Sequence, residues 1–346
     1  MLKVSFYSYK GGSGRSTTLW NTVHCLMNLV ENGEKKWMPS VKNPYIIVDA
    51  DIDSAGSTFL YKGDELFKQE NDYLSVQART KRPELTDFKS ATDDVKRQYF
   101  GKMMSIGTSF GLPESENAAI LLIGANLDKD KLTSMGVHTT DAGNEQESNL
   151  SLNITKNCRL CGAKAIFFDT PSGTQFFARW SIKQSDVVVC CMRPTSQFRT
   201  GTLGQLKEFL KLDQNHDNRR KYIITPTAVC TDPDQKFRLE LEEEPFIYPQ
   251  KAYKAIMERF YDGAAGNREI EDKYKESVVL DMLKIPDDVS DDQFVFGIPE
   301  VKRFKWQEAC LGLIKEQCIE ELNENDKLAL ERYELLANKI VYYGNK

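Results

Sequence analysis

The stretch "SYKGGSGRSTT", residues 8–18, decides the fold. It contains three glycines and lies between an apolar run, "KVSFYSY" (3–9), and a helical pattern over residues 16–31. Glycines allow backbone N–H groups to turn inward around an anion, and a helix that follows points its positive end to the same place. The order strand, glycine-rich loop, helix therefore predicts a phosphate-binding loop.

The residues that this loop predicts to contact phosphate are Gly11, Gly12, Ser13, Gly14, Arg15, Ser16 and Thr17. The backbone of the glycine-rich part would surround the phosphate oxygens, and Arg15 adds a positive charge. The Ser16 hydroxyl, at the start of the helix, is placed to bind a Mg²⁺ ion that bridges two phosphates. The alternative is a glycine turn that only lets a strand and a helix pack closely. That alternative explains the glycines but gives no reason for Lys10, Arg15 and Ser16 to lie in register.

The composition limits the function classes. The 346 residues carry 46 basic and 51 acidic side chains, a formal net charge of −5. This charge does not indicate a nucleic-acid partner, and DNA stays a possible partner only through a local basic patch. The sequence has no apolar run of about 18 residues that would span a membrane, and no leader that indicates secretion. The eight cysteines are scattered, which suits a reducing compartment. We therefore expect a cytoplasmic protein without a membrane anchor.

Apolar runs alternate with helical patterns along the chain. This alternation predicts an α/β fold with a doubly wound, mostly parallel sheet and helices on both faces. The predicted strands are at 3–9, 45–51, 118–124, 164–170, 186–192, 221–225 and 294–298, and the predicted helices at 16–31, 175–184, 199–212 and 323–341. Two polar segments, at about 60–117 and 231–293, do not fit the repeating unit and are predicted to be insertions, the first of them helical. We expect one domain over residues 1–346 that carries both insertions.

The loop "KGGSGRSTT" (10–18) resembles the deviant Walker A motif, KGGxGK[ST][ST], of the ParA/MinD group of P-loop ATPases. Four further segments resemble that family in the same order. They are "VDADIDSAGST" (48–58), "IFFDTPSGT" (166–174), "SDVVVCCMRPTSQFRTGTLGQL" (185–206) and "GIPEVKRFKWQEA" (297–309). The resemblance implies a P-loop NTPase fold, with two insertions that are atypical of the family.

The resemblance also implies a role for each residue that matches a family motif. Lys10 matches an extra lysine that reaches across a dimer interface to the partner's nucleotide. Asp51 matches the aspartate that positions or deprotonates the attacking water, and Asp49 would assist near the magnesium shell. Asp169, at the end of its strand, would hold Mg²⁺ through water. The implied cofactors are ATP and Mg²⁺, and the implied assembly is a homodimer around ATP that engages a protein partner.

Two places in the sequence depart from the family pattern. Arg15 stands where the family's loop has a lysine, and its planar fork does not put the charge at the same point as an ammonium group. Arginine binds phosphate well, so the sequence supports binding better than hydrolysis. Thr225 and Pro226 stand where the family often carries an asparagine that reads adenine. ATP is therefore inferred from the family and not from a base contact.

Three functions fit this pattern. The leading one is an ATP-binding, slowly hydrolysing dimerisation switch that acts in DNA partition, cargo positioning or a conflict system. The alternatives are a nucleotide-binding scaffold or regulatory subunit without turnover, in which Arg15 locks a bound state, and a phosphotransferase. The C-x-x-C pair of Cys158 and Cys161 is too small a set for a zinc or iron–sulfur site and is predicted to be structural or incidental.

Overall fold

The computed structural model describes residues 1–52, 54–62, 74, 77, 82, 85, 92–125, 144–193, 195–213, 220–231, 279–282, 297–305, 309–317 and 321–345. The chain divides into two compact units, each made of separate stretches of sequence. The first unit comprises Met1–Tyr7, Leu26–Asp186 and Gly344–Lys346, and the second comprises Ser8–Cys25 and Val187–Tyr343. The organisation as one domain over residues 1–346 stays a prediction.

The first unit contains strands in the order β3-β4-β2-β5-β1. Their bounds are β1 (Leu2–Tyr7), β2 (Tyr45–Asp49), β3 (Met104–Ser105), β4 (Ile120–Ile123) and β5 (Ala165–Asp169). All neighbours pair in parallel except β3, which runs antiparallel to β4. Every residue of β2, β4 and β5 is buried. Strands with such continuous apolar runs are typical of a parallel sheet that is covered on both faces.

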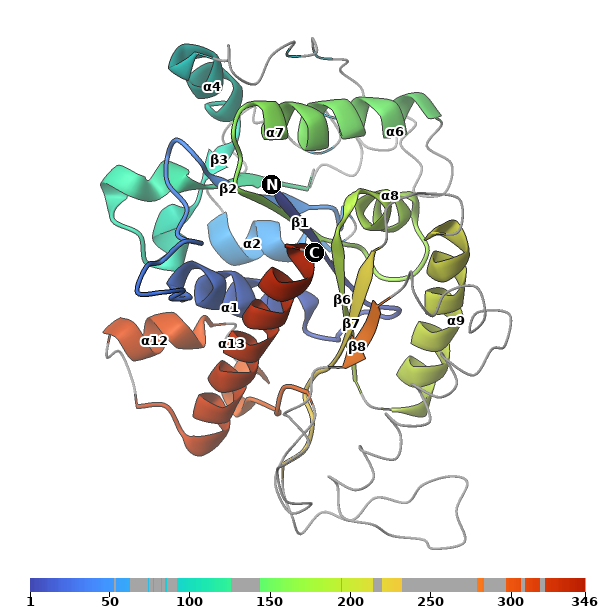
Figure 1. Ribbon diagram of the computed structural model, residues 1–346. Coiled ribbons are helices and arrows are strands. Elements are labelled where there is room, and N and C mark those ends of the chain that lie inside the picture. The colour runs from blue at the N-terminus through green and yellow to red at the C-terminus, as the bar shows by residue number, and fades with distance from the viewer. Residues whose placement is uncertain are drawn as a thin grey trace, which may run out of the picture. The chain divides into compact units, whose positions relative to one another are not determined.

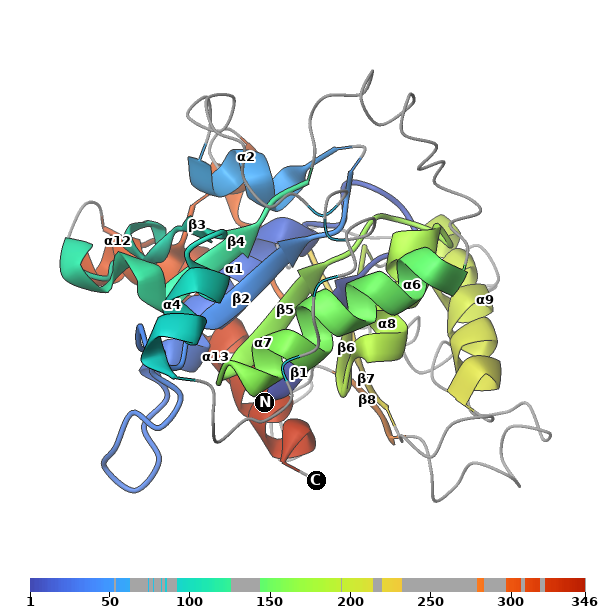
Figure 2. The same cartoon turned by 90° about the horizontal axis from the view of Figure 1, so that it is seen from above.

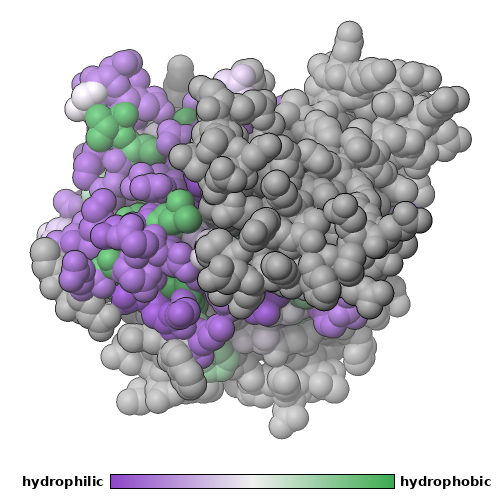
Figure 3. Space-filling model, turned by 90° about the horizontal axis from the view of Figure 1, so that it is seen from below, coloured by the Kyte–Doolittle hydropathy of each residue, from purple (hydrophilic) through white to green (hydrophobic). Residues whose placement is uncertain are grey.

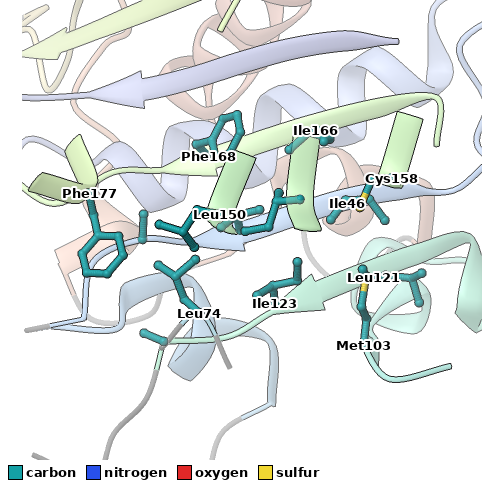
Figure 4. Close-up of a cluster of buried hydrophobic side chains, with 14 of the residues drawn as sticks. Ile46, Leu74, Met103, Leu121, Ile123, Leu150, Cys158, Ile166, Phe168 and Phe177 are labelled. Carbon is teal, nitrogen blue, oxygen red and sulfur yellow. The ribbon is translucent and has the colours of Figure 1, made fainter. Parts of the chain in front are cut away.

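One face of these strands packs against a helical layer, with a cluster of buried side chains between them (Figure 4). The layer, seen in Figure 2, consists of α6 (Asn144–Leu150), a π-helical turn (Ser151–Lys156), α7 (Asn157–Leu160) and α8 (Phe176–Gln184). Alternate strand residues supply the core on this side, including Ile46, Ile123 and Phe168, which lie in one cluster with Leu150 and Trp180. The Phe168 and Trp180 rings meet edge to face at a centroid distance of 5.3 Å. This packing holds the ends of β2 and β5 in fixed positions.

The second unit contains strands in the order β6-β7-β8, all parallel (Figure 1). Their bounds are β6 (Val187–Met192), β7 (Lys221–Pro226) and β8 (Val279–Met282). The helices are α9 (Ser196–Asp213), which packs on β6, with α12 (Leu311–Gln317) and α13 (Glu324–Gly344). The helix α1 (Arg15–Asn28) belongs to this unit as far as Cys25.

The α13 helix begins with reciprocal capping. The Asn323 side chain accepts from the Asp326 N–H at 2.9 Å, and the Asp326 carboxylate accepts from the Asn323 N–H at 3.3 Å. Such a box satisfies two donors at a helix start. The Arg303 guanidinium also donates to the Asp326 carboxylate, at 2.8 Å.

Most of the predicted elements are present within a few residues of their predicted bounds. The first six predicted strands correspond to β1, β2, β4, β5, β6 and β7, and the four predicted helices to α1, α8, α9 and α13. The predicted strand at 294–298 is wrong where it is described, because residues 297 and 298 do not form a strand. Instead, Ile298 N–H donates to the Pro226 carbonyl at 2.8 Å, beyond the end of the ladder.

The two segments that were predicted to be insertions contain regular elements where they are described, and their being insertions stays a prediction. The segment 231–293 includes β8, which pairs in parallel with β7, so this part extends the sheet. The segment 60–117 holds the helix α4 (Asp93–Phe100), as expected, but also β3 and two 3₁₀ helices, Gly107–Phe110 and Glu114–Ala119. Residues 63–73, most of 75–91, 232–278 and 283–293 lie outside the described residues.

Among the residues described, no helix combines the length and apolar character that a membrane span requires. In the described part of the face in Figure 3, hydrophobic residues lie scattered among hydrophilic ones. Hydrophobic residues that are scattered in this way need no partner to explain them.

Candidate functional site

The glycine-rich loop lies in the second unit, directly before α1. Gly12 and Gly14 have positive φ angles of 77° and 74°, a conformation that favours glycine. A Cβ atom added at Gly11, Gly12 or Gly14 would meet no atom within 4 Å. The loop therefore curves around open space, which is the geometry that a bound anion requires.

The carbonyl groups of this loop are held on its outer side. The Ser8 hydroxyl donates to the Lys10 carbonyl at 3.0 Å, the Arg193 Nε donates to the Gly12 carbonyl at 2.9 Å, and the Thr227 hydroxyl donates to the Ser13 carbonyl at 2.7 Å. In a trans peptide the carbonyl and the following N–H point in opposite directions.

The N–H groups on those three peptides, of Gly11, Ser13 and Gly14, therefore face away from the three donors. None of them has a hydrogen-bond acceptor in the described part of the chain. Successive backbone N–H groups without an acceptor, beside open space, are the groups from which an anion-binding cradle is built.

The first turn of α1 places the polar side chains of the motif. Thr18 N–H donates to the Gly14 carbonyl at 2.8 Å, which starts the helix directly after the loop. Arg15 is the first helical residue and is only 9% exposed, whereas Ser16 is half-buried. The positive end of the helix and the Arg15 guanidinium thus lie at the same end of α1, where both favour an anion.

Lys10 is exposed and reaches toward α9. Its Nζ donates to the Gln197 Oε1 at 2.9 Å. The place of Lys10 in the loop was predicted from the sequence, but its partner Gln197 was not. Gln197, Arg193 and Thr227 all follow the ends of β6 or β7. Their position directly after two predicted strands is the sequence signal that could have identified them. Ligand sites in α/β folds lie beyond the carboxyl ends of such strands.

A hollow of about 290 Å³ lies beside the loop, within the second unit. It is lined by Gly12, Ser13, Gly14, Thr17, Thr18, Arg193, Thr227, Ala228, Ile298, Pro299, Glu300, Val301, Phe304, Lys305 and Tyr333. Glu300 and Lys305 form an ion pair at 2.9 Å. Thr225 and Pro226, where the sequence lacks the family's asparagine, lie inside β7 and do not line this hollow.

An acidic cluster lies in the first unit, at the carboxyl ends of β2 and β5. Asp49 and Asp169 are the last residues of these strands and are paired in register, and both are fully buried. The Ser57 hydroxyl donates to the Asp169 carboxylate at 2.6 Å. The Thr58 N–H donates to the Asp49 carboxylate at 2.7 Å. The first turn of α2 (Gly56–Lys62) therefore supports both carboxylates. Ser57 and Thr58 were not among the predicted site residues, although both lie within the motif that contains Asp49.

Asp51 lies just beyond β2 and is 6% exposed. Its carboxylate accepts from the Ser54 hydroxyl at 2.6 Å and from the Ser54 N–H at 3.2 Å, and its own N–H donates to the Asp49 carboxylate at 3.2 Å. The structure thus brings Asp49, Asp51 and Asp169 together at one edge of the sheet. Asp51 is the most exposed of the three, which suits contact with a water molecule or a ligand.

Burial raises the pKa of the Asp49 carboxyl well above its usual range, and the neighbouring Asp169 carboxyl raises it further. Hydrogen bonds from Thr58 act in the opposite direction without reversing the shift. A carboxyl with a raised pKa in the folded state favours folding when it is protonated and costs stability when it ionises. The cost therefore grows as the pH rises from the acid range toward the raised pKa.

We expect Asp49→Asn to gain about 0.5–2 kcal/mol of stability relative to the wild type between about pH 5 and about pH 8. Asparagine carries no charge, so it avoids the cost of ionising a buried carboxyl. Its single carbonyl oxygen can accept from the Thr58 N–H or the Asp51 N–H but not from both, and this loss is the same at both pH values. Denaturant unfolding at the two pH values measures the effect. A difference between variant and wild type that does not change with pH would contradict the raised pKa of Asp49.

Magnesium keeps several waters and takes only one or two protein ligands besides phosphate oxygens. The Ser16 hydroxyl of the second unit and the Asp169 carboxylate of the first unit are groups of the kind that it takes. The residues described contain no set of three or more His, Cys, Asp or Glu side chains that could hold a metal alone. Cys158 and Cys161 are free and buried, and Cys158 belongs to the core cluster of the first unit.

Comparison with family models and with curated proteins finds no match. Solved structures are similar over nearly the whole chain. Apo McdA from Cyanothece has a TM-score of 0.51 at 12% identity, covering 96% of this chain and 99% of that one. A ParA-family ATPase from Chlorobium tepidum TLS has a TM-score of 0.51 at 11% identity, covering 96% and 98%. The chain has the fold of the ParA-family ATPases.

The ParA-family fold confirms the predicted fold class, an α/β P-loop NTPase fold with mostly parallel strands. An ATP complex of a Cyanothece McdA variant shares it, with a TM-score of 0.50, 12% identity and coverage of 99% and 96%. At these identities the likeness concerns the fold. The site residues in this ParA-family fold therefore rest on the geometry of the loop and of the acidic cluster.

Proposed function

We propose that this chain is an ATP-binding, slowly hydrolysing dimerisation switch of the ParA/MinD type. The observation that carries the proposal is the loop at residues 8–14, whose outward carbonyls leave three N–H groups free to bind an anion. The ParA-family fold supports the proposal, because a Cyanothece McdA variant with this fold has been solved as a complex with ATP. The Walker A resemblance names the anion as the phosphate chain of a nucleotide.

Each residue of the site has a role in this proposal. The loop from Gly11 to Gly14 and the side chains of Arg15, Ser16 and Thr17 bind the phosphates. Ser16 holds Mg²⁺ directly and Asp169 holds it through water. When bound, Mg²⁺ neutralises charge on the phosphate oxygens. Asp51 positions the attacking water, and Asp49 assists near the magnesium shell.

The hollow beside the loop supports a nucleotide site in the second unit. The nucleoside occupies the hollow beside the loop, where Thr227, Ala228 and Pro299 take the place of the family's asparagine. This hollow is partly apolar, which suits the faces of a base.

Lys10 supplies the dimerisation step. In the single chain its ammonium group is held by Gln197, and in the dimer it binds the nucleotide of the partner chain. A surface hydrogen bond of this kind is weak enough to be exchanged for contact with a phosphate. ATP binding thereby favours the dimer by mass action. The dimer then presents a surface to a protein partner in DNA partition, cargo positioning or a conflict system.

Light scattering tests the dimer. We expect the molecular mass of the wild type to double on addition of ATP and Mg²⁺, and the mass of Lys10→Ala to stay that of a monomer while it still binds nucleotide. The matched control is Lys183→Ala, because Lys183 pairs with Glu147 in the first unit. A wild type that stays monomeric with ATP demonstrably bound would show that the lysine has no role in trans.

The second candidate function is a nucleotide-binding scaffold or regulatory subunit without turnover. Arg15 favours it, since a nearly buried arginine at the first helical residue binds phosphate without supplying the compact charge of a lysine. Phosphate release from ATP separates the two functions. A chain that binds ATP and dimerises but releases no phosphate is a scaffold.

A further inference from the structure

A second hollow, of about 820 Å³, lies in the first unit. Its lining residues are Met1, Ser40, Asn43, Lys156, Arg159, Leu160, Gly162, Ala163 and Lys164. It lies where β5 begins, whereas Asp49 and Asp169 lie where β2 and β5 end. Figure 2 shows α7 and the N-terminal end of the chain side by side at this place. The hollow is therefore distinct from the acidic cluster of the same unit.

Cations gather around this hollow. Lys156 and Arg159 are three residues apart on one helical stretch, so that their side chains lie on the same face, and Lys164 comes from the turn before β5. A fourth cation, Lys96 of α4, lies close by, since its Nζ is 3.9 Å from the position that a Cβ on Gly162 would take. No carboxylate is among the lining residues, all of which are described. The hollow is therefore a local positive site on a chain whose net charge is −5.

The lining is ordered by specific contacts. The Lys164 Nζ donates to the Met38 carbonyl at 2.8 Å, and burial lowers the pKa of the Lys164 ammonium from its usual value. The Asn43 amide donates to the Gly162 carbonyl at 2.9 Å, and Gly162 has a φ of 87°. Partial burial removes water from the Lys164 ammonium group, which makes its charged form less favourable. A bound anion would stabilise that charged form, and the lysine is already held in position.

We propose that this hollow binds a small anion that carries phosphate groups. Its volume falls in the range of about 300–1,000 Å³ that is typical of small-molecule sites. The guanidinium of Arg159 and the ammonium groups of the lysines are the donors that phosphate oxygens prefer. A nucleic acid would contact a wide surface with its backbone, whereas these cations surround one hollow. The site therefore takes a compact ligand such as a diphosphate.

Chemical footprinting with pyrophosphate as the probe tests this site. An amine-reactive reagent modifies exposed lysines, and mass spectrometry reads each lysine separately. We expect pyrophosphate to protect Lys156 and Lys164 in a saturable manner, and to leave Lys35, which lies outside the lining, unprotected. Protection of Lys10 would indicate that pyrophosphate binds at the glycine-rich loop, so the same experiment measures binding at both sites.

Variants test whether the protection of Lys156 and Lys164 comes from pyrophosphate bound in the hollow. Arg159→Glu should raise the pyrophosphate concentration for half-protection of Lys156 and Lys164 by at least about tenfold, while the matched charge change Lys35→Glu leaves it unchanged. The protection should persist in Arg15→Glu, which affects only the loop. Circular dichroism checks that each variant is folded.

Three outcomes would overturn the proposal. The first is that Lys156 and Lys164 stay unprotected by pyrophosphate in the wild type. The second is that a folded Arg159→Glu variant shows undiminished protection. The third is that duplex DNA protects these lysines where pyrophosphate does not, because the site would then be a nucleic-acid surface.

Discussion

Replacing Asp51 with asparagine is expected to reduce phosphate release from ATP by about 100-fold or more, which is the usual contribution of a group that handles a proton or positions water. ATP affinity should change little, because asparagine keeps an oxygen that can accept from Ser54. The charge that acts on water is lost, whereas the loop that binds phosphate is untouched. Steady-state phosphate release and equilibrium ATP binding, measured on the same samples, separate the two effects.

The matched control for this variant is Asp186→Asn. Asp186 is a carboxylate of the same unit as Asp51, but it forms an ion pair with Lys3, near the amino end of β1. Its loss should leave phosphate release unchanged. Undiminished release in Asp51→Asn would mean that another group positions the water. A wild type that binds ATP without any release would instead favour the scaffold function.

Replacing Arg15 with glutamate is expected to weaken ATP binding by at least about 100-fold, which corresponds to about 2.8 kcal/mol. Arg15 is the first residue of α1 and is 9% exposed. A carboxylate at this place would repel the phosphates inside a partly water-excluded cradle, where charges act more strongly than in solvent. Calorimetric titration of ATP into wild type and variant measures the change.

Arg15→Lys is the matched control, because it keeps the charge and restores the family's loop lysine. It should bind ATP with an affinity within about tenfold of the wild type, since lysine also binds phosphate as a point charge. A faster phosphate release in this variant would show that arginine limits turnover. Equal ATP affinity in a folded Arg15→Glu variant would mean that the nucleotide is not bound at this loop.

The local part of the site could be predicted from the sequence. The loop, its glycines and the polar start of α1 lie within 11 consecutive residues, so spacing alone relates them. Asp49 and Asp169 follow apolar runs, and such runs are strands whose ends meet at one edge of a parallel sheet. The acidic cluster therefore follows from two short patterns that are far apart in the chain.

The long-range hydrogen bonds that hold the carbonyl groups of the loop could not be predicted in the same way. Arg193 and Thr227 bond to loop carbonyls that are 181 and 214 positions away. No local pattern encodes such contacts, because they depend on which strands become neighbours. β8 was missed for a related reason, since its four residues lie inside a long polar segment. The cations around Gly162 also come from separate elements that only folding brings together.

Calorimetric titration of ATP with Mg²⁺ into the purified wild-type chain tests the central claim, that the loop at residues 8–14 is a nucleotide site. The outward carbonyls and inward N–H groups predict saturable binding of about one ATP for each chain, lost in Arg15→Glu and retained in Arg15→Lys. A folded wild-type chain that shows no saturable ATP binding, and carries no nucleotide when purified, would contradict the account.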